Sequence, residues 1–175
     1  YGTTAKFRLL EINHADAVIS GVALENGYME ETYGVGGNLR ISKAGGTITN
    51  CVIRNGTMLN QGSGGAGIAM FAGRLTHSVV SNNYSRGHTD INHTGAIDLL
   101  GGVADNCLVT GNRSDGSKAP YYPDVAGVNV AGGSLRNSTI VQNTAKTCGG
   151  VWIRNSTAGS VVNCIIAGNT STGMP

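Results

Sequence analysis

The chain has 175 residues, a formal net charge of +2 and only 13% charged residues, which fits a single domain over residues 1–175. Its few basic residues form no cluster, so no nucleic-acid partner is expected. No run of about 18 apolar residues occurs, so no membrane span is expected in this chain.

A nine-residue pattern recurs along the chain, in the form apolar–x–Asn–small–x–apolar–x–x–Asn. A weak first copy, VISGVALEN, spans residues 18–26 with Ser20 at its centre. The central positions of successive copies are 30, 27, 29, 31 and 26 residues apart, counted from this first copy. The chain is therefore built from six units of similar length. The five later copies are Ile48–Gly56, Leu75–Asn83, Ala104–Asn112, Leu135–Asn143 and Val161–Asn169.

Each unit contains about three short β-rich runs separated by Gly, Asn or Ser, and none contains an amphipathic segment of helix length. A repeat of this length without helices predicts an all-β solenoid, a right-handed parallel β-helix of about six coils with three short strands in each. Variation in repeat length falls in loops between the third strand and the next first strand. We expect these loops at residues 27–35, 57–64, 84–94, 113–125 and 144–148.

The inward positions change their spacing at one point in each coil. An apolar residue such as Val18 or Ile48 is followed by the next inward residue three positions later, where a straight strand would place it two positions later. This spacing predicts a bend, and asparagine occupies it in four coils because it tolerates left-handed backbone angles. We expect these residues to stack as an internal asparagine ladder: Asn50, Asn106, Asn137 and Asn163.

Three of the four cysteines, Cys51, Cys107 and Cys164, fall in one inward column on alternate coils. Neighbours in that column are about 9–10 Å apart at strand spacing, whereas a disulfide needs Cα atoms within about 7 Å. Cys148 lies on a loop, out of register. The sequence therefore predicts four free cysteines that act as small apolar residues.

The outward positions of the first strands form a candidate ligand face. A tryptophan can stack there on a sugar ring, and neighbouring polar side chains offer hydrogen bonds. Two tyrosines on the longest loop flank the same face. The alternative interpretation is a solvated strand face with a single tryptophan. The candidate glycan-binding residues are Arg40, Asp98, Asn129, Trp152, Tyr121 and Tyr122.

No catalytic residues are assigned on this face. A glycosidase uses two carboxylates about 5–10 Å apart, and Glu11 lies three coils from Asp98, about 14 Å at strand spacing. Asp90 or Asp124 could approach Asp98 from the loops, which keeps catalysis open. The loop sequence HTDINH at residues 88–93 holds two histidines and an aspartate, but its spacing matches no closed zinc pattern. We therefore expect no metal site and no cofactor.

The outward positions of the third strands are unusually apolar. Exposed strands usually carry Thr, Ser or Lys at such positions, and an apolar row across the coils is typical of a contact surface. It would pack against another copy, another domain or a lid segment, and the alternative is simple β-propensity on an exposed sheet. The candidate contact stripe comprises Val22, Val52, Val79, Leu108 and Ile165, with Thr139 in the fifth coil.

Several motifs resemble the polymorphic outer-membrane-protein repeats of bacterial autotransporter passengers, whose pattern is GGA-apolar followed by aromatic-x-x-Asn. The architecture is also similar to that of the wider pectate-lyase-like group. The resemblance implies an extracellular or cell-surface protein that acts as an adhesin or a structural passenger. The matching segments are GGVW at 149–152, TGAI at 94–97, IVQNTA at 140–145 and IAGNTS at 166–171, with Val or Ile in place of the aromatic residue.

The expected function is non-enzymatic: an extracellular or cell-surface structural or adhesive module. Bare terminal coils expose unpaired strand edges, so we expect either a fragment of a longer passenger chain or a subunit that stacks end to end into filaments. The candidate partners are other copies, the rest of a passenger chain, and glycans. The alternatives are a polysaccharide lyase or glycoside hydrolase of pectate-lyase-like fold and a glycan-binding module.

Overall fold

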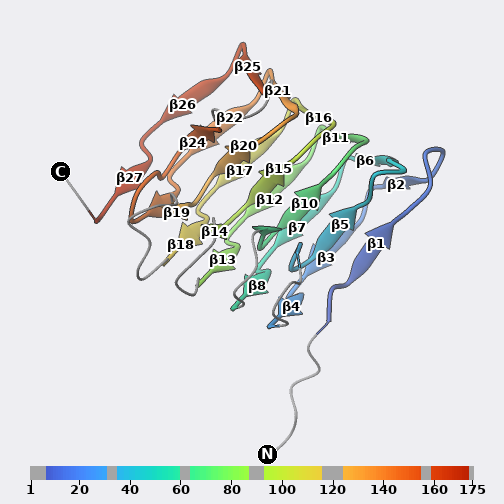
Figure 1. The fold of residues 1–175 in the computed structure, drawn as a ribbon, viewed down its shortest axis with the longest axis horizontal. Helices are drawn as coiled ribbons and strands as arrows, with labels where there is room; N and C mark the ends of the chain where they lie inside the picture. Colours follow the sequence, from blue (N-terminus) through green and yellow to red (C-terminus); the bar gives the residue numbers. More distant parts are fainter. Residues whose placement is uncertain are drawn as a thin grey trace, which may run out of the picture.

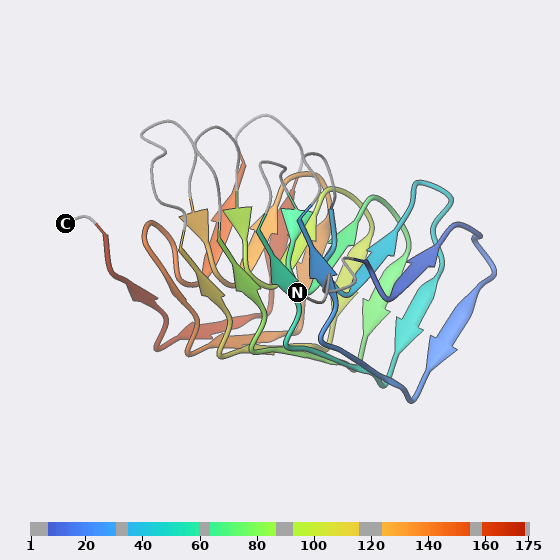
Figure 2. The same ribbon diagram turned by 90° about the horizontal axis from the view of Figure 1, so that it is seen from below.

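The protein is an all-β parallel solenoid, drawn as a ribbon in Figures 1 and 2. The computed structural model describes residues 7–30, 35–59, 64–86, 93–115, 124–154 and 159–173. Within these residues the strands form four parallel six-stranded sheets, each of which takes one strand from every coil, and one parallel three-stranded sheet. The coils stack so that the first and the last lie at opposite ends of the molecule. The predicted fold class is confirmed.

We name the four sheets A to D in chain order. Sheet A contains β1 (Leu10–Ile12), β5 (Leu39–Ile41), β10 (Ile68–Met70), β15 (Ile97–Leu99), β20 (Val128–Val130) and β24 (Val151–Ile153). Sheet B contains β2 (Val18–Ser20), β6 (Thr47–Thr49), β11 (Arg74–Thr76), β16 (Val103–Asp105), β21 (Ser134–Arg136) and β25 (Ser160–Val162). Sheet C contains β3 (Ala23–Glu25), β7 (Val52–Arg54), β12 (Val79–Ser81), β17 (Leu108–Thr110), β22 (Thr139–Val141) and β26 (Ile165–Ala167). Sheet D contains β4 (Tyr28–Met29), β8 (Thr57–Met58), β13 (Tyr84–Ser85), β18 (Arg113–Ser114), β23 (Thr144–Ala145) and β27 (Thr170–Ser171).

The coil therefore has four strands in the main sheets, where the sequence predicted three. Five of the six strands of sheet D lie in segments that the repeat pattern placed in loops, and β27 follows the last predicted loop. The short strands β9 (Gly64–Gly65), β14 (His93–Thr94) and β19 (Asp124–Val125) lie at the ends of three predicted loops and form the three-stranded sheet. The fourth strand forms because the backbone bends a second time after the third strand. At this second bend every coil has a residue with positive φ. These residues are Asn26, Asn55, Asn82, Gly111, Gln142 and Gly168.

The interior is lined by aliphatic side chains stacked in columns. In sheet A, Ile41, Met70, Leu99 and Val130 pair with one another in one column, and all four are 0% exposed. Burial of each such side chain contributes about 1.5–3 kcal/mol. These columns run from coil to coil and form the core of the solenoid.

The first coil is shifted by one residue from the predicted pattern. Ile19 pairs with Ile48, while the Val18 side chain is 63% exposed. The shift arises because Gly21, with φ of +70°, forms the left-handed bend that the pattern placed at Ser20. Glycine adopts this conformation without a Cβ clash.

All four cysteines are free, as predicted. Each coil has a left-handed bend between its strands in sheets B and C, which we call the first bend. Cys51 and Cys107 directly follow this bend and are buried. Serine occupies the same position in the coils that follow them: Ser78 Oγ accepts a hydrogen bond of 3.1 Å from the Cys51 N–H, and Ser138 Oγ accepts one of 3.1 Å from the Cys107 N–H. Burial raises the pKa of the Cys107 thiol to about 11. This column is therefore a structural feature of the first bend.

Candidate functional site

The outward face of sheet A carries the predicted ligand face in a single column. Register pairs Arg40 with Ala69, Ala69 with Asp98, Asp98 with Asn129, and Asn129 with Trp152. The order of the column is as predicted, but Asp98 and Asn129 are only 1% and 2% exposed. The prediction of an exposed binding face was wrong for these two residues. A strand pattern tells which side a residue points to, but not whether that side is covered.

The two ends of the column are more accessible. Arg40 Nη1 lies 3.1 Å from Glu11 Oε1, and the Arg40 guanidinium carbon lies 5.2 Å from the centroid of the Phe71 ring. Trp152 is 37% exposed. Arg40 and Trp152 are four coils apart, about 19 Å at strand spacing, which is too far for both to contact one sugar residue. The two other predicted residues, Tyr121 and Tyr122, lie outside the described residues.

Asp98 is a buried carboxyl group with an incomplete set of partners. Its Oδ1 accepts a hydrogen bond of 2.8 Å from Asn129 Nδ2, whereas its Oδ2 is buried without a hydrogen-bond partner. Burial raises the pKa of Asp98 to about 6, although the bond from Asn129 and the charge of Arg154 act in the opposite direction. Buried carboxyl groups with a raised pKa occur both at catalytic sites and in structural networks.

Asp124 does not join Asp98 in a pair of carboxylates. Asp124 is 5% exposed and accepts hydrogen bonds from the Ser114 hydroxyl and, at 2.9 Å, from the Lys146 N–H. The described residues contain no group of three or more His, Cys, Asp or Glu side chains placed to hold a metal ion. The other loop residues considered from the sequence, His88 and Asp90, lie outside the described residues.

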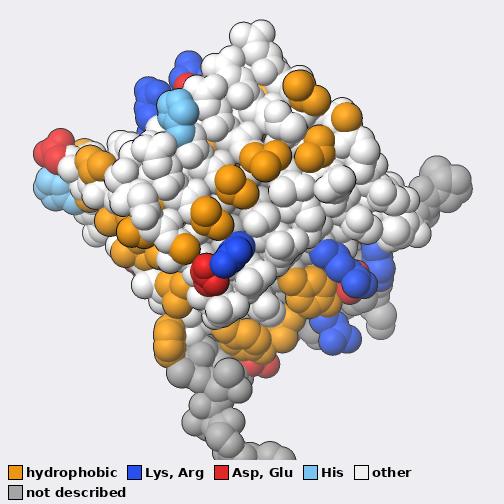
Figure 3. Space-filling view, turned by 180° about the vertical axis from the view of Figure 1, so that it is seen from behind, with side chains coloured by type: hydrophobic (Ala, Val, Ile, Leu, Met, Phe, Trp, Pro, Cys, Tyr) orange, Lys and Arg blue, Asp and Glu red, His pale blue; other side chains and the backbone are white. Residues whose placement is uncertain are grey.

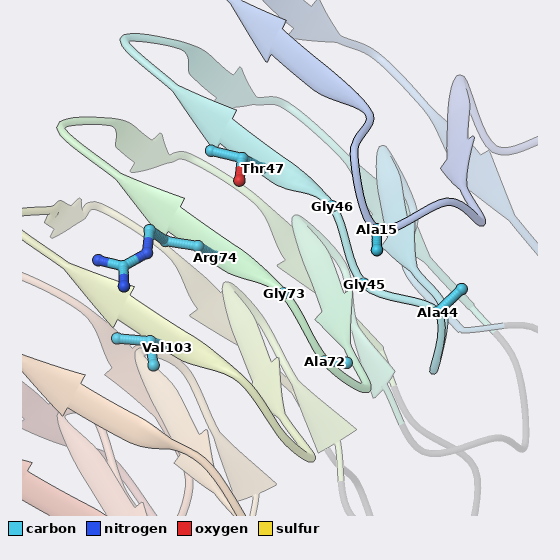
Figure 4. Close-up of a pocket in the computed structure, with 9 residues that line it drawn as sticks. All are labelled: Ala15, Ala44, Gly45, Gly46, Thr47, Ala72, Gly73, Arg74 and Val103. Carbon is cyan, nitrogen blue, oxygen red and sulfur yellow. The ribbon is translucent and has the colours of Figure 1, made fainter.

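A shallow hollow of about 320 Å³ lies at the turns between sheets A and B, as Figure 4 shows. Thr47, Arg74 and Val103 stand on neighbouring strands beside it, and Arg74 Nη1 lies 3.9 Å from Asp105 Oδ2. The hollow was not predicted from the sequence, because most of its lining is alanine and glycine, which have no functional side chain. The rest of its lining consists of Ala15, Ala44, Gly45, Gly46, Ala72 and Gly73.

The outward face of sheet C carries an apolar row across the coils, and Figure 3 shows hydrophobic side chains running diagonally over this side of the molecule. Leu108 and Ile165 are 37% and 62% exposed. In the first coil the row contains Ala23 in place of the predicted Val22, because of the one-residue shift. Its role in contact with a partner stays a prediction. The row consists of Ala23, Val52, Val79, Leu108, Thr139 and Ile165.

The asparagines at the first bend have the predicted left-handed backbone, with φ between 49° and 52°. Their side chains are exposed, so the predicted position of the internal ladder was wrong. At each left-handed corner the corner residue points outward and the residue after it points inward. The residues concerned are Asn50, Asn106, Asn137 and Asn163.

The buried asparagine ladder lies at the second bend, on the last asparagine of the nine-residue pattern. Asn112 Oδ1 accepts two hydrogen bonds of 2.9 Å from Asn83, one from its backbone N–H and one from its Nδ2. Asn112 Nδ2 donates in turn to Asn143 Oδ1 at 2.8 Å. The sequence contained this pattern, but three repeats have asparagine at both the third and the last position, and the spacing does not tell which of the two faces inward. The ladder consists of Asn83, Asn112, Asn143 and Asn169.

In the first two coils glycine takes the ladder position, and Asn38 fills the space. Asn38 Oδ1 accepts a hydrogen bond of 2.7 Å from the Gly27 N–H. Asn38 Nδ2 donates to the Arg54 carbonyl at 3.0 Å and to Asn83 Oδ1 at 3.1 Å. A Cβ added to Gly56 would lie 2.5 Å from Asn38 Nδ2, so this arrangement requires glycine. Asn38 therefore extends the ladder to the start of the solenoid.

Replacing Asn38 with alanine should lower the free energy of unfolding by about 2–3 kcal/mol, because buried hydrogen-bonding groups lose their partners. Urea unfolding followed by circular dichroism measures the loss. The control is Asn55→Gly, at an exposed left-handed position of the same region, which should change stability by no more than about 0.5 kcal/mol. Equal effects of the two substitutions would contradict the role given to Asn38.

The last coil exposes side chains at inward positions. Ile153 and Ile166 are 52% and 47% exposed, whereas their partners in the preceding coil, Val130 and Ile140, are 0% exposed. We call this surface the end face. It consists of Ile153, Val161, Cys164, Ile166 and Asn169.

No helix able to span a membrane occurs among the residues that the structure describes. Comparison of the chain with protein-family models, with curated proteins and with solved structures gave no match in any of the three.

Proposed function

We propose that the protein is an extracellular or cell-surface structural or adhesive module whose end face docks a further parallel coil. The observation that carries the proposal is the exposure of Ile153 and Ile166, at positions that are fully buried in the preceding coil. Apolar side chains beside unpaired strand edges are prone to association. A docked coil would cover these side chains and pair the free edges.

The location outside the cell is supported by the resemblance of the repeats to those of autotransporter passengers. In such a module the solenoid is a spacer whose length grows by about 4.8 Å with each coil. The apolar row of sheet C runs along the spacer and supplies a lateral surface for adhesion.

The proposal is tested by adding a seventh coil, namely a copy of residues 125–147 placed after Gly173. Val125 bridges Cys148, and Thr144 pairs with Thr170, so this junction keeps the spacing of the native one. If the copy docks, maleimide labelling of Cys164, followed by mass spectrometry, should slow by about tenfold or more, because the thiol becomes protected. The added coil contains no cysteine of its own.

The matched control is the same fusion with lysine in place of the copied Ile140. A charged side chain at this inward position cannot be buried without a large cost, so the control should leave Cys164 as reactive as in the parent chain. Unchanged labelling of Cys164 in the unaltered fusion would contradict the proposal.

Asp98 favours a second candidate, a carbohydrate-active enzyme of pectate-lyase-like fold. Its support is the buried carboxyl with a raised pKa on the outward face of sheet A. Cleavage of a polysaccharide by the protein, lost in Asp98→Asn, would favour this candidate over the structural one.

A further inference from the structure

The contacts between successive coils have a fixed direction at both bends. At the first bend the backbone N–H donates to the following coil, as from Asn137 to the Val162 carbonyl at 3.0 Å. At the second bend the backbone N–H and Nδ2 of Asn143 both donate to Asn169 Oδ1, at 3.0 and 2.9 Å. Each coil thus needs an acceptor from the coil after it.

The last coil presents the same donors without acceptors. The backbone N–H groups of Asn163 and Asn169, which correspond to those of Asn137 and Asn143, have no acceptor in the part of the chain that the structure describes. Asn169 Nδ2 donates to the Ile140 carbonyl at 2.8 Å, which leaves its other hydrogen for a following coil. The end face therefore offers two donors at the ladder position, beside the exposed Ile166 side chain.

The first coil of a second copy does not supply the matching acceptor. Its residue at the ladder position is Gly27, which has no side chain. Its outer edge is also partly occupied, because the Phe7 carbonyl accepts a hydrogen bond of 3.2 Å from the Tyr28 N–H. In the next coil the corresponding acceptor is the Gly27 carbonyl, which accepts from the Thr57 N–H at 2.8 Å. The Phe7 carbonyl thus occupies the place that a carbonyl of a preceding coil would take.

We infer that the end face selects a parallel coil with asparagine at the second bend, and that it rejects the first coil of another copy. This inference rests on the proposed function, since it names the partner of the same surface. A ladder asparagine gives one oxygen to both Asn169 donors, as Asn169 does for Asn143. Glycine at that position leaves two donors buried without a partner, which is costly.

The test compares two versions of the seventh-coil fusion, one with the copied Asn143 and one with glycine in its place. The substitution lies only in the added coil, so the parent coils are the same in both. Labelling of Cys164 should be slower in the asparagine version by at least about tenfold, because two buried donors gain an acceptor and a tenfold change corresponds to about 1.4 kcal/mol. Circular dichroism confirms that both fusions are folded.

The outcomes separate the two claims. Protection of Cys164 in both fusions to the same extent would overturn the selection by asparagine and leave the docking of a coil intact. No protection in either fusion would overturn both. For the unmodified chain, sedimentation velocity over a concentration series should show no end-to-end assembly. Polymers that disappear in an Ile166→Lys variant would overturn the rejection of the first coil.

Discussion

Replacing Asn112 with alanine should lower the free energy of unfolding by about 4 kcal/mol, which is large for a single substitution. The Asn112 side chain is 1% exposed and makes five hydrogen bonds. Alanine would leave the backbone N–H and the amide of Asn83 without their acceptor inside the solenoid. It would also remove the donor to the Val80 and Thr110 carbonyls. Urea unfolding monitored by circular dichroism measures the change.

Two further variants separate hydrogen bonding from packing. Asn106→Gly, at the exposed first bend of the same coil, should change stability by no more than about 0.5 kcal/mol, because glycine accepts a positive φ. Asn112→Asp keeps the size of the side chain but removes its N–H donors, so at pH 7 it should cost at least as much as alanine. Equal losses for Asn112→Ala and Asn106→Gly would contradict the position of the ladder.

Asn106 and Asn112 show which features of the fold could be predicted from the sequence and which could not. The repeat length, the absence of helices and the spacing of apolar residues were sufficient to predict the coils and most of the inward columns. The nine-residue pattern also marked both bends, but Asn106 and Asn112 are the same residue type. Asparagine suits an exposed left-handed corner and a buried hydrogen-bond ladder equally well. Only the backbone path decides which asparagine faces inward.

The candidate ligand face could also be predicted only in part. The order of residues in the column follows from the repeat, and the register confirms it from Arg40 to Trp152. The burial of Asp98 and Asn129 does not follow from the repeat, because burial depends on what covers the sheet. The sequence also did not predict where the Asp124 side chain points. This side chain accepts a hydrogen bond from the Ser114 hydroxyl, and that contact depends on the path of the chain before sheet A.

Replacing Asp98 with asparagine should raise the free energy of unfolding at pH 7.5 by about 2–3 kcal/mol. Burial raises the pKa of Asp98 in the folded chain to about 6, from an ordinary value of 3.8. Because the folded state holds this proton more tightly than the unfolded state, the contribution of Asp98 to stability is most favourable below about pH 4 and is lost as the pH rises towards 6. At about 1.4 kcal/mol per tenfold difference in proton affinity, the loss is about 3 kcal/mol. Asparagine carries no charge and can still accept the bond from Asn129.

The measurement is urea unfolding of both proteins from pH 4 to pH 8, with Asp16→Asn as a control that removes an exposed carboxylate and should keep the wild-type profile. Asp105 contributes outside this window: the Asn137 amide and Arg136 hold its pKa below the usual value, so its stabilisation is lost only in stronger acid. A variant less stable than wild type at pH 7.5 would contradict the role given to Asp98. The expected gain would mean that the ionised carboxyl opposes folding at neutral pH.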